Sequence, residues 1–330
     1  MKKRMMVWVA AIVVAGAWTG GAARVQAQRD KATWTKPDSE QVKADIEKAK
    51  KDAGTQWADE AQFFCETGRA NRPDEPVTEP TKIFDNVYSL GRTSTINYII
   101  TTSDGLILLD SGYAKDVEDV LIPGVKKLGF DPAKIKDVIV MHGHADHFGG
   151  SSYLQEHYGS HIYISAADWD MMEHAPVPAN GAAPPPRPGR DKIITAGEPI
   201  ILGGEKIMPV AIPGHTPGAV GLIFPVKDNG KTYMAAVFGG LILTLDRPTD
   251  EGLQQYIQSI AHFKEEAKKA NVQVELENHA MMDDMPQKLE KLEARKKGDP
   301  NPFVVGQASY QVFLNVMSDC AHAEADRRKE

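Results

Sequence analysis

The stretch Met141-His142-Gly143-His144-Ala145-Asp146-His147-Phe148-Gly149-Gly150 places four potential metal ligands within six residues. It follows the apolar run Val138-Ile139-Val140-Met141, which is typical of a buried strand, and precedes a helical pattern over residues 149–158. A strand end holds side chains on a rigid edge, and polar groups crowded beside a buried strand require partners. Imidazole and carboxylate groups are ligands that suit zinc. We therefore predict metal ligands at His142, His144, Asp146 and His147.

Two histidines further along the chain also follow apolar runs. His215 lies in Pro213-Gly214-His215-Thr216-Pro217-Gly218, where turn-forming residues fix its direction. His279 lies just past the strand pattern of residues 272–276. We predict that both complete the metal site. Of the remaining histidines, only His174 could reach the site, from the loop over residues 173–190. The others are interpreted as surface residues: His157, His161, His262 and His322.

Strand and helix patterns alternate on both sides of this stretch, which predicts an α/β layered domain over residues 81–330. A proline-containing loop over residues 173–190 separates two halves, and it is either functional or a solvated connector. The predicted strands are 87–90, 96–100, 106–110, 138–141, 162–164, 200–202, 207–212, 219–224, 234–238 and 272–276. The predicted helices are 117–128, 149–158, 252–270, 285–296 and 309–328.

The N-terminal part of the chain has two sections. Residues 1–27 combine a basic start, a short apolar run and small residues before Gln28, which predicts a secretory signal peptide. The alternative, a membrane anchor, requires about 20 apolar residues. Residues 28–80 predict an extension, with an amphipathic helix from Asp38 and a polar, proline-rich linker over residues 71–80. We therefore expect a periplasmic or secreted protein that has no contact with the membrane after cleavage.

Composition and charge narrow the class of partner. The chain has 42% hydrophobic and 25% charged residues, as expected of a soluble globular protein. Its formal net charge is −7, and removal of residues 1–27, which contain four basic and no acidic residues, leaves 34 basic and 45 acidic residues and a net charge of −11. Nucleic-acid binding requires a basic surface. We thus expect a small-molecule substrate rather than nucleic acid, and the sequence leaves the oligomeric state open.

The chain has two cysteines, Cys65 and Cys320, and neither belongs to a Cys-x-x-Cys motif. In an oxidising compartment they can form one disulfide between the extension and the C-terminal helix. The alternative is a pair of free thiols, since sequence alone does not fix connectivity.

The His-x-His-x-Asp-His segment, the downstream Gly214-His215 and the strand-end His279 together resemble the metallo-β-lactamase superfamily. The upstream segment 108–112, Leu-Leu-Asp-Ser-Gly, is similar to that superfamily's first motif. Within the superfamily, the chain most resembles subclass three (B3) of the class B β-lactamases. This closer resemblance rests on the segment 301–305, on Tyr310 and 319–321, and on the lack of a cysteine near residue 240.

The resemblance implies a four-layer αββα sandwich, an α/β (α+β) fold, with two zinc ions at one edge of its sheets. It implies that one Zn²⁺ is bound by His142, His144 and His215, and the other by Asp146, His147 and His279. A metal-bound hydroxide would attack an acyl centre, with Asp146 as the catalytic residue that orients it. Asp110 is either a residue that holds a ligand histidine or a helix N-cap.

Two departures from the resembled families bear on the substrate. The segment Phe238-Gly239-Gly240-Leu241 lacks the bridging aspartate of glyoxalase II-type and lactonase-type enzymes. Gly240 and Ile242 stand where B3 lactamases usually offer serines that hold the substrate carboxylate. We therefore expect β-lactam ring opening, of the kind that gives antibiotic resistance, to be weak or confined to certain lactams, unless Arg187 or Arg190 binds the carboxylate. The alternatives are hydrolysis of an ester, a lactone or an activated aryl halide, and a non-enzymatic zinc-binding protein.

Overall fold

The computed structural model describes residues 37–67, 76–175, 183–241, 249–280 and 282–329. Residues 38–330 form one compact unit. The predicted signal peptide, Ile242 and part of the 173–190 loop lie outside the described residues. Among the described residues, no helix has the length and apolar character needed to cross a membrane.

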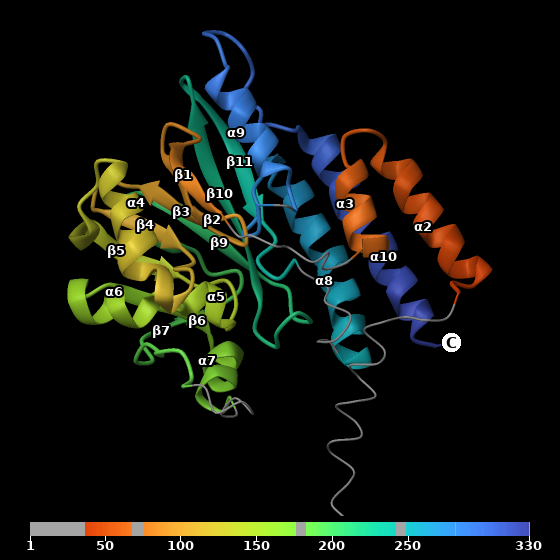
Figure 1. Ribbon diagram of the computed structural model, residues 1–330, viewed down its shortest axis with the longest axis horizontal. Coiled ribbons are helices and arrows are strands. Elements are labelled where there is room, and N and C mark those ends of the chain that lie inside the picture. Colours follow the sequence, from red (N-terminus) through yellow and green to blue (C-terminus); the bar gives the residue numbers. More distant parts are fainter. Residues whose placement is uncertain (1–36, 68–75, 176–182, 242–248, 281, 330) are drawn as a thin grey trace, which may run out of the picture. The chain divides into compact units, whose positions relative to one another are not determined.

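The first sheet has seven strands in chain order, antiparallel from β1 to β4 and parallel from β4 to β7 (Figure 1). Parallel neighbours need a crossover, and helical segments supply it between these strands. The carboxyl ends of β4, β5 and β6 consequently meet at one edge. The strands are β1 (Val77–Lys82), β2 (Val87–Arg92), β3 (Thr95–Thr101), β4 (Leu106–Leu109), β5 (Ile135–Ile139), β6 (His161–Ser165) and β7 (Lys192–Ile194).

The second sheet has five strands in the order β12-β11-β10-β9-β8. A two-residue turn, Asn229-Gly230, joins β10 to β11, and both residues have the positive φ angles of a hairpin turn. The last strand pairs in parallel with β11 after a helical crossover. The strands are β8 (Ile200–Leu202), β9 (Glu205–Ala211), β10 (Val220–Asp228), β11 (Lys231–Val237) and β12 (Val272–Glu275).

Helices cover the outer face of each sheet, which gives the predicted αββα sandwich (Figure 1). The first sheet is covered by α4 (Ile122–Lys127), α6 (Ser151–Tyr158) and α7 (Ala166–Glu173). The second is covered by α8 (Asp250–Lys269) and α10 (Gln307–Arg327), and α2 (Glu40–Ala53) packs on α10. The other helices are α3 (Ala58–Gln62), α5 (Ala145–Phe148), α9 (Met285–Glu293), and the short η1 (Phe63–Thr67), η2 (Ala114–Asp116), η3 (Val117–Leu121) and η4 (Pro132–Lys134).

Side-chain alternation along the strands builds three apolar layers. On β3, Tyr98 and Ile100 point between the sheets, whereas Ile99 packs among the residues under α4, α6 and α7. All three are fully buried. The strands were predicted as short β-type runs between turns, and the two-residue period shows how one strand serves both faces of its sheet. The layer between the sheets supports the strand ends that carry the predicted ligands.

The N-terminal extension is part of the compact unit. The predicted helix from Asp38 is confirmed as α2, which Ser39 caps through its Oγ atom and which packs on α10. Cys65 and Cys320 form the disulfide that the sequence left open, with their Cα atoms 4.6 Å apart. The predicted linker is wrong at its end, because residues 77–82 form strand β1 at the edge of the first sheet. Helix α7 and strand β7 were also not predicted.

A buried group of charged residues lies between α3, α9 and the end of β12. Lys288 of α9 pairs with Glu275 and lies 3.8 Å from Asp283, and both carboxylates are fully buried. Glu60 of α3 is 1% exposed, and neither of its carboxylate oxygens has a hydrogen-bond partner. Burial, reinforced by the negative charge of Asp284, raises the pKa of Glu60 to about 9. The folded protein therefore holds Glu60 protonated at neutral pH.

Glu60→Gln should flatten the pH dependence of stability. Between the unfolded pKa of 4.5 and the folded pKa of about 9, the folded state binds more protons, so its stability falls as pH rises. The neutral amide removes this loss, which amounts to at most about 1.4 kcal/mol per pH unit. Urea unfolding at several pH values from 6 to 9 measures it. Exposed Glu47→Gln is the control, and equal slopes for wild type and Glu60→Gln would contradict the assignment.

Candidate metal centre

The predicted ligands converge because each follows the carboxyl end of a strand. Residues 142–147 follow β5, His215 follows β9 and His279 follows β12. The predicted placement beside one strand end is confirmed, with one correction. Asp146 and His147 lie in the one-turn helix α5 rather than in a loop, because His144 adopts an extended N-cap conformation and Phe148 is buried.

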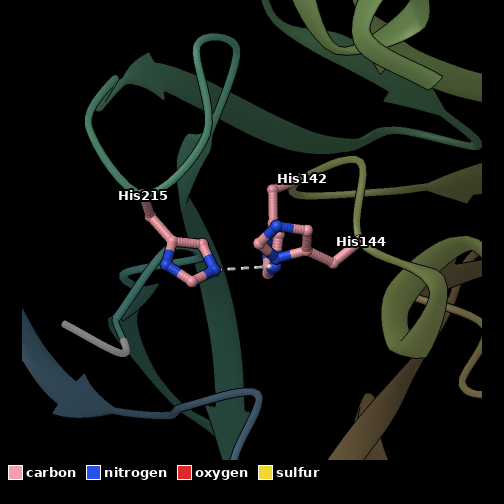
Figure 2. Close-up of side chains that lie close together, drawn as sticks. All are labelled: His142, His144 and His215. Atoms are coloured by element: carbon pink, nitrogen blue, oxygen red, sulfur yellow. Dashed lines mark hydrogen bonds between the residues drawn. The ribbon is translucent and has the colours of Figure 1, made fainter. Parts of the chain in front are cut away.

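His142, His144 and His215 form the first cluster. One ring nitrogen from each lies within 4.8 Å of the others. Figure 2 shows the first two on one loop and His215 facing them from another. His142 Nδ1 donates to Gly239 O at 2.6 Å, which leaves Nε2 as the lone-pair atom, 3.2 Å from His215 Nε2. Three imidazole nitrogens gathered in this way are a donor set for a cation.

Asp146, His147 and His279 form the second cluster, and their ligand atoms also lie within 4.8 Å of one another. His147 Nδ1 donates to Asp110 Oδ2 at 2.6 Å, and His279 Nδ1 donates to Ser94 O. His147 Nε2 is buried without a hydrogen-bond partner, 3.5 Å from Asp146 Oδ2. An orphaned buried nitrogen beside a carboxylate fits a metal ion. The second donor set therefore also suits a cation.

The electrostatics of the site bear on whether these side chains are in the protonation states that bind a metal ion. Burial, with the neighbouring imidazoles, lowers the pKa of His142 well below its usual value, so its ring is neutral. Burial acts to raise the pKa of Asp146, but His147, His279 and His144 outweigh it and bring the pKa to about 2. The pKa of His147 is raised, because the carboxylates of Asp110 and Asp146 outweigh its burial. A metal at His147 Nε2 would displace that proton.

Asp110 and Asn278 orient the ligands from behind. Asp110 is fully buried, and its carboxylate accepts from Met141 N at 2.9 Å as well as from His147. The alternative interpretation of Asp110 as a helix N-cap is wrong, because η2 begins at Ala114 and follows Tyr113. Asn278 donates to Asp110 Oδ2 at 3.2 Å and to Gly239 O at 3.1 Å. Sequence reasoning missed Asn278, although it directly precedes His279.

The segment 239–241 runs close beneath the first cluster without a carboxylate. A Cβ atom on Gly239 would lie 2.3 Å from Val220 O, and one on Gly240 would lie 3.0 Å from the Cβ atom of His215. The backbone here can approach the histidines because neither residue has a side chain. A serine at position 240 would crowd His215.

A cavity of about 540 Å³ opens beside His144. Its walls are mainly apolar and come from α5, α7 and the described end of the 173–190 loop. His174 lies at this cavity, as the sequence allowed. Arg187 also lines it and donates to Met172 O. The lining residues are Gly143, His144, Ala145, Phe148, Met171, Met172, His174, Ala175, Pro184, Pro185 and Arg187.

Comparisons with known proteins agree with this geometry. The profile of the metallo-beta-lactamase superfamily matches residues 90–228. A hydroxyacylglutathione hydrolase of Photobacterium profundum is 29% identical over 34% of this chain and 36% of its own length. Metallo-beta-lactamase domain-containing protein 1 of Xenopus laevis is 30% identical over 36% of this chain and 43% of its own length. The chain thus matches less than half of either relative.

Solved structures match far more of the chain. A subclass B3 metallo-beta-lactamase of Bradyrhizobium japonicum is 25% identical with a TM-score of 0.61, covering 76% of this chain and 93% of that one. A mutant metallo-beta-lactamase from Legionella gormanii is 24% identical with a TM-score of 0.65, covering 78% and 99%. The chain is similar to the metallo-β-lactamase superfamily over residues 90–228, and its fold is similar to that of B3 enzymes. Its fold and its two clusters of histidine and aspartate side chains are compatible with metal binding.

His144→Ala and Asp146→Asn should each lower the metal content by about one ion per chain and abolish any metal-dependent turnover, because each removes one ligand from a three-residue set. Both ligands sit on a scaffold whose core lies elsewhere, so circular dichroism should stay native. Metal analysis of dialysed protein measures the effect, with exposed His262→Ala as the control. Full metal content in both variants would remove these residues from the centre.

Proposed function

We propose that the protein is a dinuclear zinc hydrolase acting on an acyl centre. His142, His144 and His215 would hold one ion, and Asp146, His147 and His279 the other. The observation that carries this proposal is the convergence of two complete three-ligand sets from three strand ends. Three protein ligands leave a position for water or substrate, whereas structural zinc sites have four. This favours an enzyme over a non-enzymatic zinc-binding protein.

Zinc bound at such a pair of sites supplies an activated water and a Lewis acid for the carbonyl oxygen. The chain's own residues prepare the site for this chemistry. Gly239 O fixes the ring of His142, and Asp110 fixes that of His147. Asp146 is ionised and partly exposed. The carboxylate oxygen that does not bind the metal can therefore accept a hydrogen bond from an attacking water and orient it. The ligand cluster offers no serine or cysteine, and no protein nucleophile is required.

β-Lactam ring opening is the reaction that we propose first, on the similarity to B3 enzymes. The alternative is an ester, a lactone or an activated aryl halide. Relatives named N-acyl homoserine lactonase and hydroxyacylglutathione hydrolase are similar over part of the chain. Gly240 supports a restricted β-lactam range, since it offers no hydroxyl near His215. The apolar cavity beside His144 suits the remainder of a small-molecule substrate.

We also propose that the protein acts in the periplasm or outside the cell. The Cys65–Cys320 disulfide supports an oxidising compartment, since such bonds are rare in the cytosol. The basic and apolar pattern of residues 1–27 supports export.

Turnover of nitrocefin, imipenem, a lactone and an aryl ester, with and without a chelator, tests the proposed function. We expect chelator-sensitive hydrolysis. The kcat/KM for imipenem should lie below about 10⁶ M⁻¹s⁻¹, a value that efficient enzymes commonly reach. Activity unchanged after removal of all metal would overturn the zinc mechanism. A carbapenem value at or above that level would overturn the restricted lactam range.

Arg187→Ala should selectively lower kcat/KM for substrates that carry a carboxylate. Arg187 lines the cavity, and among the described residues its guanidinium donates to Met172 O but forms no ion pair, so its remaining N–H groups can donate to a substrate anion. A lost charge-assisted hydrogen bond costs about 1.5–3 kcal/mol, roughly ten- to a hundredfold in kcat/KM. Steady-state kinetics should show this for a lactam and not for an uncharged ester. The matched control is Arg190→Ala, whose side chain pairs with Asp170. Equal losses on both substrates would exclude anion recognition by Arg187.

A further inference from the structure

Asp168 is a fully buried aspartate that belongs to neither ligand cluster. It lies in the first turn of α7, directly after β6. One carboxylate oxygen accepts from Gly143 N at 2.7 Å and from Thr216 Oγ1 at 2.7 Å. The other accepts from Gly218 N at 2.8 Å. A single carboxylate therefore receives three hydrogen bonds of short to normal length.

These three donors belong to the two loops that form the first cluster. Gly143 separates His142 from His144, and Thr216 directly follows His215. The first loop extends from β5 in one sheet, and the second extends from β9 in the other. A backbone hydrogen bond from Val220 N to Met141 O, at 2.9 Å, also connects the bases of these loops. Asp168 is the side chain that connects them beside the histidines.

Two glycines make this contact possible. A Cβ atom on Gly143 would lie 2.8 Å from Met171 Cε and 3.2 Å from the Cβ atom of Asp168. One on Gly218 would lie 2.0 Å from Ser165 Oγ and 2.7 Å from Asp168 N. Ser165 Oγ in turn accepts from Asp168 N at 3.2 Å, which caps the helix and fixes the aspartate. Both ligand loops are thus shaped around this one carboxylate.

We propose that Asp168 is the positioning residue of the first metal site. It sets the separation between the loop of His142 and His144 and the loop of His215, so that the three imidazoles are in place before a metal ion binds. This inference rests on the proposed role of these histidines as zinc ligands. Residues that hold metal ligands typically account for 10- to 100-fold in affinity. Asp168 should therefore act on the first site and leave the second site unchanged.

Zinc affinities of the separate sites test this. In a His279→Ala background, which disables the second site, Asp168→Asn should raise the Kd of the remaining site 10- to 100-fold in a chelator competition. The amide has one acceptor oxygen and turns two hydrogens toward donors. In a His215→Ala background, the same change should leave the second-site Kd within about twofold. Asp137→Asn, on strand β5, is the buried-aspartate control.

A second pair of variants keeps the test valid if Asp168→Asn does not fold. Thr216→Val removes one donor to the carboxylate, whereas Thr216→Ser keeps it. The valine should weaken the first site and shift the absorption spectrum of the Co²⁺-loaded protein, and the serine should restore both. Equal weakening of both sites, or none, would overturn the role of Asp168. Failure of the wild type to bind zinc would instead overturn the proposed function.

Discussion

The carboxylate of Asp110 is the contact on which the arrangement of the centre depends. It follows β4, and it accepts from the backbone of Met141 after β5, from His147 in α5 and from Asn278 after β12. The ends of three strands in two sheets are thereby fixed to one buried charge. Such a group is costly to bury alone. With these hydrogen bonds in place, it gives the imidazole of His147 a defined orientation.

Sequence reasoning located the six predicted ligands because each one follows an apolar run, and strand ends are visible in hydrophobic periodicity. Asp168 was not visible in this way. Its segment, Ser165-Ala166-Ala167-Asp168-Trp169, has the composition of an ordinary helix start, and its partners are 25 to 50 residues distant. Strand β1 was misassigned because Pro80 indicates a linker. Proline is tolerated there because β1 is an edge strand.

The second sheet and its helices support the centre from the other side. Trp57, the residue that precedes α3, donates to Ser309 at the start of α10, and Lys288 of α9 lies over the rings of Trp57 and Phe303. The same lysine pairs with Glu275, at the end of the strand that leads to His279. The N-terminal extension is therefore continuous with the packing behind the second cluster. A protein without residues 38–67 would expose this buried charge to water.

The disulfide closes a covalent loop that contains both sheets and every predicted ligand. Its cysteines are 255 residues apart, so closure restricts the unfolded chain by about 5 kcal/mol of entropy in the loop model. The closed loop also changes the effect of a cut in the backbone. A protease that cleaves an exposed turn such as Gly203-Gly204 would nick the ring without releasing a fragment. In an environment that contains proteases, a nicked molecule would keep its two halves together as one covalent body.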